Sequence, residues 1–276
     1  MSATHEHETT VSGLGGTETV RTTGYLTDLF TERAVQIVSR NRTRPLFLNL
    51  QYNAPHWPWQ APGDPPYADS LRWRGGGSPE TFARMMESMD TGIGRVLEAL
   101  HRRGMERDTL VIFTSDNGGE RFSHMAPFSH GKMTLYEGGI RVAATARWPG
   151  MIPAGSATHQ VAVTMDWAAT LLALAGAHAP RTAPLDGIDL MPALTGARAP
   201  AGRDLFWRIA QRRSQKALRS GDWKYLQTDA GEFLFDLAAD AGEKQDRKAD
   251  EPAVLAQLKA KYAAWEADVL PPIPLD

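Results

Sequence analysis

Residues 109–142 read TLVIFTSDNGGERFSHMAPFSHGKMTLYEGGIRV, a strand pattern that ends in a group of polar side chains. The run at residues 110–113 is continuously apolar, which is typical of a short strand buried on both faces of a parallel sheet. Asp116 and Asn117 follow shortly after it. Because open α/β sheets place their chemistry at the carboxyl ends of the strands, these two residues are candidates for a functional site.

Asp116 and Asn117 admit two interpretations. Carboxylate and amide oxygens are the ligands that Ca²⁺ and Mg²⁺ prefer. Asp-Asn-Gly-Gly is also a turn sequence, since Asn-Gly favours tight hairpins. The continuous apolar run before it suits a central strand better than a hairpin arm, and this favours the ligand interpretation. His130 and Lys132 lie in the following loop, where a lysine could neutralise an oxyanion or simply be solvated.

The segments around this stretch alternate between helix and strand patterns. Apolar residues at three- and four-residue steps predict helices over residues 26–38 and 79–100. Residues 46–52 read as a strand, and His56 follows in a proline-rich loop, where a functional role and a surface role are both open. The order helix, strand, helix, strand predicts the α/β fold class.

The domain organisation follows from changes in composition. Residues 1–24 are rich in Thr, Ser and Gly and predict a flexible tail. Residues 25–202 form the α/β domain. Residues 203–276 predict a small α+β subdomain, an antiparallel sheet plus a closing helix, because short alternating segments flank a turn at residues 228–231.

Composition excludes several classes of function and leaves the compartment open. The chain has 276 residues, 42% of them hydrophobic, with a net charge of −2 and no cysteine. It therefore offers no electrostatic case for nucleic acid and no thiol nucleophile. No apolar run reaches the roughly 18 residues of a membrane span. No signal-peptide pattern opens the sequence, so the localisation is unknown.

Several motifs share one resemblance. Besides Asp-Asn-Gly-Gly at 116–119, they are Gly-Lys at 131–132 and Tyr-Glu-Gly-Gly at 136–139, together with the segments YLTD at 25–28, NAPHWP at 53–58, MDTGIG at 89–94 and SGDWKY at 220–225. Taken together, these motifs resemble the sulfatase family of the alkaline-phosphatase-like superfamily. The resemblance implies a mixed sheet flanked by helices, with a small C-terminal α+β subdomain.

The resemblance implies an arylsulfatase-like sulfuric ester hydrolase. Sulfatases use a formylglycine, made from Cys or Ser in a Cys/Ser-x-Pro-x-Arg motif, and a divalent cation, usually Ca²⁺ (or Mg²⁺). By resemblance, Asp116 and Asn117 are metal ligands. His56 and Lys132 are catalytic and contact the sulfate, and His130 helps to bind the substrate. The expected partner is a sulfate-ester small molecule or a sulfated sugar, with neither nucleic acid nor a membrane span.

The sequence also departs from the family pattern. It has no Cys/Ser-x-Pro-x-Arg motif, no Asp-Asp pair and no Gly-Lys-x-His motif. It therefore resembles the C-terminal two-thirds of a sulfatase, with the N-terminal strands and the formylglycine precursor missing. We expect a truncated chain that is inactive alone, binds Ca²⁺ weakly and has a missing N-terminal fragment as a further partner.

Two other interpretations stay open. One is a phosphonate or phosphate ester hydrolase of the same superfamily, against which the Asp-Asn-Gly-Gly and Tyr-Glu-Gly-Gly pair argues. The other is a non-catalytic binding module that kept the fold without the nucleophile. A reading frame that encodes Cys-x-Pro-x-Arg just upstream of Met1 would favour truncation over this module.

Overall fold

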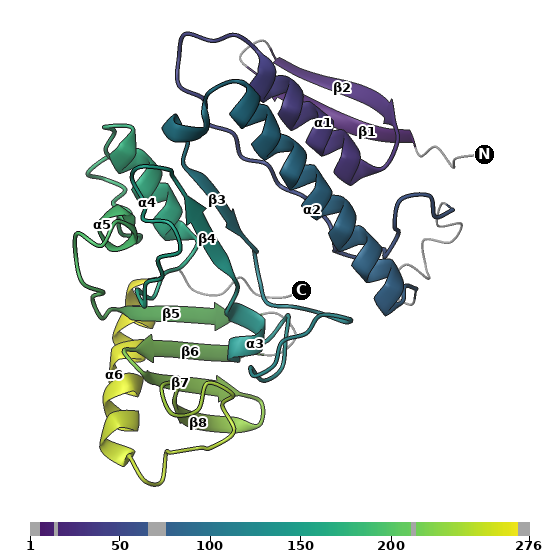
Figure 1. The fold of residues 1–276 in the computed structure, drawn as a ribbon. Coiled ribbons are helices and arrows are strands. Elements are labelled where there is room, and N and C mark those ends of the chain that lie inside the picture. Colours follow the sequence, from purple (N-terminus) through teal and green to yellow (C-terminus); the bar gives the residue numbers. More distant parts are fainter. Residues whose placement is uncertain (1–5, 14–15, 66–75, 211–213, 270–276) are drawn as a thin grey trace. The chain divides into compact units, whose positions relative to one another are not determined.

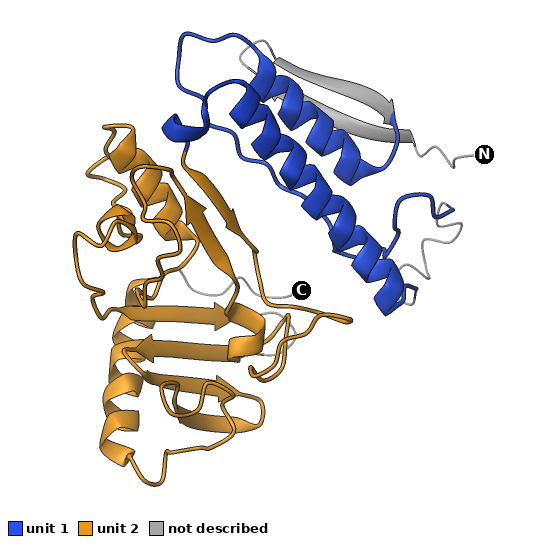
Figure 2. Ribbon diagram, viewed as in Figure 1, with its two compact units in different colours: residues 1–109 blue, residues 110–276 orange. Residues whose placement is uncertain are grey.

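The structure, a computed structural model, describes residues 6–13, 16–65, 76–210 and 214–269. The chain divides into two compact units, residues 1–109 and 110–276, which are described separately (Figures 1 and 2). The predicted domain boundary between residues 202 and 203 falls inside the second unit and stays a proposal. Among the described helices, none is long and apolar enough to cross a membrane.

The first unit begins with two antiparallel strands, β1 (Glu6–Gly13) and β2 (Gly16–Thr23). They lie within the predicted flexible tail, of which residues 1–5 and 14–15 are outside the described residues. The flexibility of this segment stays a prediction.

Two helices follow where the sequence predicts them, α1 (Leu26–Ser39) and α2 (Pro79–Arg102). The Ser78 side chain accepts a hydrogen bond from the Thr81 amide at 3.1 Å and caps α2, and a proline is favoured at the first helical position. Gly104, with φ +64°, follows the helix end. The two helices pack against each other, and each has buried apolar residues, Ala34 and Val38 in α1 and Met85 and Met89 in α2.

The sequence predicts a strand over residues 46–52, but these residues form no strand in the structure. A strand is defined by its ladder partner, and no described segment pairs with this one. Tyr52 instead contacts α1, where its hydroxyl lies 2.8 Å from the Thr31 hydroxyl. The short 3₁₀-helix η1 (Glu106–Asp108) ends the unit.

The second unit opens with β3 (Val111–Thr114), which pairs with β4 (Ala144–Arg147). The position of β3 agrees with the prediction, but the expected parallel pairing and burial on both faces are wrong. The ladder is antiparallel and the Phe113 side chain is 42% exposed. Because each strand has one partner among the described residues, one edge of each stays open, and less side-chain surface is buried.

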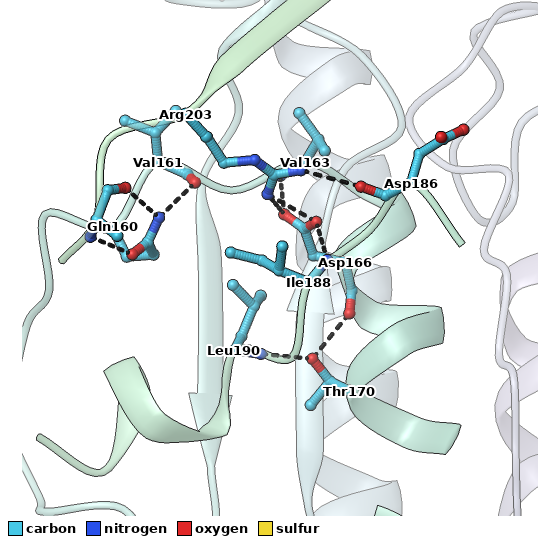
Figure 3. Close-up of polar contacts among 10 residues, drawn as sticks. Gln160, Val161, Val163, Asp166, Thr170, Asp186, Ile188, Leu190 and Arg203 are labelled. Atoms are coloured by element: carbon cyan, nitrogen blue, oxygen red, sulfur yellow. Dashed lines mark hydrogen bonds and ion pairs between the residues drawn. The ribbon is translucent and has the colours of Figure 1, made fainter. Parts of the chain in front are cut away.

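A buried carboxylate organises the segment after β4, which includes α4 (Met165–Leu174) and α5 (Met191–Leu194). Asp166 is fully buried, and its two oxygens each lie 2.8 Å from one Arg203 guanidinium nitrogen (Figure 3). The same carboxylate accepts hydrogen bonds from the amides of Val163 at 2.8 Å and Ile188 at 2.9 Å. This single side chain therefore joins three separate parts of the segment.

The C-terminal sheet comprises β5 (Asp204–Ile209), β6 (Gln215–Ser220), β7 (Trp223–Thr228) and β8 (Gly231–Asp236), all antiparallel and in chain order (Figure 1). The helix α6 (Pro252–Asp268) covers one face, where Leu258 and Tyr262 join the core. On the other face, Leu135 packs against Ala217 and Leu226. The segment after Lys132 therefore forms part of the sheet's second core.

Candidate functional site

Backbone hydrogen bonds fold residues 115–140 into an interlocked loop around α3 (Glu137–Ile140). The Gly118 amide donates to the Gly139 carbonyl at 2.8 Å. The Lys132 amide donates to the Gly119 carbonyl at 2.8 Å, and the Gly138 amide donates to the Ser129 carbonyl at 3.0 Å. These bonds bring the Asp-Asn-Gly-Gly, Gly-Lys and Tyr-Glu-Gly-Gly motifs into one local structure.

Glycine is required at the centre of this loop. A Cβ atom added to Gly118 would lie 2.7 Å from the Gly138 carbonyl carbon and closer still to its oxygen. A Cβ added to Gly138 would lie 2.5 Å from the His130 carbonyl oxygen. Real Cβ atoms essentially never approach other atoms so closely, so the motif glycines permit the close backbone packing.

Asp116 and Asn117 form a local turn directly after β3. One Asp116 carboxylate oxygen accepts a hydrogen bond from the Asn117 amide at 2.9 Å, and the Ser115 hydroxyl donates to the Asn117 carbonyl at 3.1 Å. Asp116 is exposed and Asn117 is half-buried. Because Asp116 is exposed, an ion from solvent could reach this residue.

Lys132 and His130 lie on the same loop with different environments. The Lys132 ammonium is 3.5 Å from the Glu120 carboxylate, and its side chain is 21% exposed. His130 is exposed, and its ring packs against the Tyr136 ring in a tilted arrangement, with centroids 4.0 Å apart. Burial, with a smaller effect of the Glu243 charge, raises the pKa of the Tyr136 hydroxyl. Tyr136 therefore stays neutral near pH 7.

The backbone of this loop adopts strained conformations. Phe122 has φ 71°, His130 has φ 59° and Met133 has φ 69°, all in the left-handed region that residues with a Cβ seldom occupy. Such conformations persist where the surrounding structure holds them, and they gather at functional sites.

His56 lies in the first unit and is described with it. Its side chain is exposed, and its Nδ1 atom is 2.6 Å from the Trp57 carbonyl oxygen. The other four predicted site residues, Asp116, Asn117, His130 and Lys132, all belong to the interlocked loop of the second unit. Within the described ranges, no three His, Cys, Asp or Glu side chains gather as a metal site would require.

Three buried charged residues, Glu137 within the loop and Lys224 and Glu243 beside it, have no role predicted from the sequence. Lys224 of β7 is fully buried and lies 2.8 Å from both Glu137 and Glu243. Burial raises the pKa of the Glu243 carboxyl, although Lys224 opposes this shift. One signal was available, since Lys224 shares an inward strand face with the apolar Leu226.

Similarity to known proteins shows the family of the chain. The sulfatase family model matches residues 3–177. The chain belongs to the sulfatase family. It is 36% identical to the N-acetylgalactosamine-6-sulfatase of Canis lupus familiaris over 179 residues, which are 62% of this chain and 33% of that protein. It is 34% identical to the arylsulfatase A of Homo sapiens over 230 residues, which are 80% of this chain and 43% of that protein.

The solved structures agree with this family assignment. The crystal structure of Ps i-CgsB superposes with a TM-score of 0.79 at 31% identity, over 90% of this sulfatase chain and 57% of that protein. The predicted α/β, alkaline-phosphatase-like fold class is therefore confirmed. The match to the canine sulfatase spans about a third of that relative's length.

Proposed function

We propose that this chain supplies the sulfate-binding and metal-binding residues of a sulfuric ester hydrolase. The observation that carries the proposal is the interlocked loop, whose backbone bonds hold Asp116, Asn117 and Lys132 in one structure. The loop thus carries a carboxylate that could bind a cation and an ammonium group that could bind an anion, the two ions of a metal–sulfate pair.

The metal site has the right kind of ligand for a hard cation. Asp116 offers a carboxylate and Asn117 an amide oxygen, which suit Ca²⁺ or Mg²⁺ and not softer metals. Ca²⁺ takes about six to eight oxygen ligands, so these two would need further oxygens from elsewhere. When bound, such a cation would stabilise negative charge on the sulfate oxygens. Asp116 and Asn117 would hold it, and we expect its affinity for these two ligands alone to be low.

Lys132 and His56 would act on the sulfate ester itself. The ammonium group of Lys132 would bind a sulfate oxygen and offset the negative charge that develops as the ester bond breaks. His56 would contact the sulfate or give a proton to the departing alkoxide. His130 would contact the substrate. The nucleophile, a formylglycine in the family, has no precursor motif within these 276 residues, so we assign no residue to that step.

A sulfate monoester, in the form of a small molecule or a sulfated sugar, is the proposed substrate. Two similar proteins support a sulfated sugar as the substrate. One is named an N-acetylgalactosamine-6-sulfatase, and the other, Ps i-CgsB, was solved in complex with k-i-k-neocarrahexaose. Arylsulfatase A is similar over a longer part of the chain, and its name supports an aryl sulfate as the alternative substrate.

Calorimetric titration with inorganic sulfate in the presence of Ca²⁺ tests this function. We expect the wild-type chain to bind sulfate and Lys132→Ala to weaken binding by about tenfold or more, because a hydrogen bond to a charged group contributes about 1.5–3 kcal/mol. Asp116→Ala should remove the Ca²⁺ dependence of sulfate binding.

The matched control is Lys259→Ala, which removes an exposed lysine of α6 that pairs with Glu232 at 2.7 Å. We expect this variant to bind sulfate as the wild type does. Equal loss of binding in Lys132→Ala and Lys259→Ala would show a general effect of charge and would contradict the proposed site.

A further inference from the structure

Two buried polar side chains of the C-terminal sheet reach the segment that follows Lys132. Lys224 of β7 has no exposed surface, and Gln215 of β6 is 4% exposed. A lysine is almost never fully buried unless it is paired, because taking its charge out of water costs several kcal/mol. Apolar side chains would fill the same volume at less cost, so packing alone does not explain why polar groups occupy these positions.

Lys224 is tied to the loop through Glu137, the first residue of α3. Its ammonium group lies 2.8 Å from the Glu137 carboxylate and 2.8 Å from the Glu243 carboxylate. Glu243 in turn accepts a hydrogen bond from the Glu137 backbone amide at 2.6 Å. Arg141, which is half-exposed, lies 3.5 Å from the other Glu137 oxygen. Both the side chain and the backbone of Glu137 are therefore fixed.

Gln215 makes an independent connection to the same segment. Its amide oxygen accepts a hydrogen bond from the Leu135 amide at 2.9 Å. Its amide nitrogen donates to the Met133 carbonyl at 3.1 Å. Met133 directly follows Lys132 and has one of the strained backbone conformations, so Gln215 holds the chain where its conformation needs support.

Close backbone contacts connect this segment to the proposed metal ligands and leave the loop little room to move. Gly138 and Gly139 follow Glu137, and Gly139 accepts the hydrogen bond of the Gly118 amide, next to Asn117. The Gly118–Gly138 approach is too close for even one added methyl group. The Ser129 carbonyl accepts a hydrogen bond from the Gly138 amide, and the Ser129 hydroxyl donates one to the Gly242 carbonyl, next to Glu243. A shift of α3 would therefore displace both sides of the loop.

We propose that the C-terminal sheet positions the loop of Asp116, Asn117 and Lys132 through two buried polar anchors, Lys224 with its partners Glu137 and Glu243, and Gln215. In this arrangement the anchors are positioning residues that contact neither metal nor substrate. The inference rests on the proposed function for its effect on sulfate binding. Its structural part, the fixation of the loop, stands on the contacts alone.

The test compares Lys224→Met and Gln215→Leu with a matched control in the same sheet. Lys216→Met removes a lysine of β6 that pairs with Glu266 of α6 at 2.6 Å, on the other face of the sheet. Each variant is studied as the full chain, well below its unfolding temperature. The readouts are the dissociation constant for inorganic sulfate with Ca²⁺ and the hydrogen exchange of the Gly118, Lys132 and Gly138 amides.

We expect Lys224→Met and Gln215→Leu each to weaken sulfate binding by about tenfold, a usual size of coupling between two sites, and to speed exchange of the three amides. Lys216→Met should lower the unfolding temperature and leave both readouts unchanged. If Lys224→Met does not fold, Gln215→Leu carries the test, because leucine keeps the volume and the burial of the side chain.

Two failures can be told apart. If the wild-type chain binds no sulfate, or binds it independently of Lys132, the proposed function fails and amide exchange alone decides whether the anchors position the loop. If the wild type binds sulfate through Lys132 while the anchor variants match Lys216→Met in both readouts, Lys224 and Gln215 serve only stability and the positioning role is wrong.

Discussion

Replacing Gly118 by alanine is expected to lower the free energy of unfolding of the second unit by about 3 kcal/mol or more, at the upper end of the cost of overpacking. The added Cβ would meet the backbone of Gly138, 2.7 Å from its carbonyl carbon, and backbone cannot move aside as a flexible side chain can. Relief would require breaking the Gly118–Gly139 hydrogen bond and opening the loop. Urea unfolding monitored by tryptophan fluorescence measures the loss.

Gly202→Ala is the matched control, since Gly202 lies in the same unit and a Cβ there would meet no atom within 4 Å. We expect its stability to stay within about 0.5 kcal/mol of the wild type, as for most surface substitutions. If Gly118→Ala were as stable as Gly202→Ala, the close packing of the three motifs would be wrong.

Replacing Asp166 by alanine is expected to lower the free energy of unfolding by about 3–5 kcal/mol, the usual cost of breaking a buried ion pair from one side. The variant would leave the Arg203 guanidinium, whose side chain is 15% exposed, without its carboxylate. The amides of Val163 and Ile188 would lose their acceptor at the same time (Figure 3). The free energy from urea unfolding is again the measurement.

Asp250→Ala serves as the control for this second prediction. Asp250 pairs with Arg247 at 3.5 Å, but its side chain is 61% exposed, and exposed pairs contribute about 0–1 kcal/mol. A similar small loss in both variants would mean that Asp166 does not organise the segment between β4 and β5.

Elements with a local cause could be predicted from the sequence. The helices α1 and α2 follow from apolar periodicity, and α2 also has a proline at its first position; these signals lie within the helices themselves. The hairpin of β7 and β8 follows from alternation around a turn. Burial and pairing direction of β3 were mispredicted, because they depend on which strands lie beside it and not on its own four residues.

The residues of the candidate site likewise fall into those that the sequence predicts and those that only the structure reveals. Asp116, Asn117, His130 and Lys132 could be predicted because their motifs are continuous in the sequence. The role of Lys224 and Gln215 could not, since they reach the loop across 87 and 80 residues, respectively. Alternation places Lys224 on the same strand face as Leu226, but it does not show what packs against that face. Their role depends on burial, which is a property of the folded chain.

We propose that this sulfatase-family chain carries ion-binding residues of the site without a nucleophile of its own. The rate of sulfate release from an aryl sulfate, measured with the purified chain and Ca²⁺, tests it most directly. We predict no release above the uncatalysed rate, since the 276 residues contain neither cysteine nor a Ser-x-Pro-x-Arg motif. Sulfate release that is abolished by Asp116→Ala would contradict the claim.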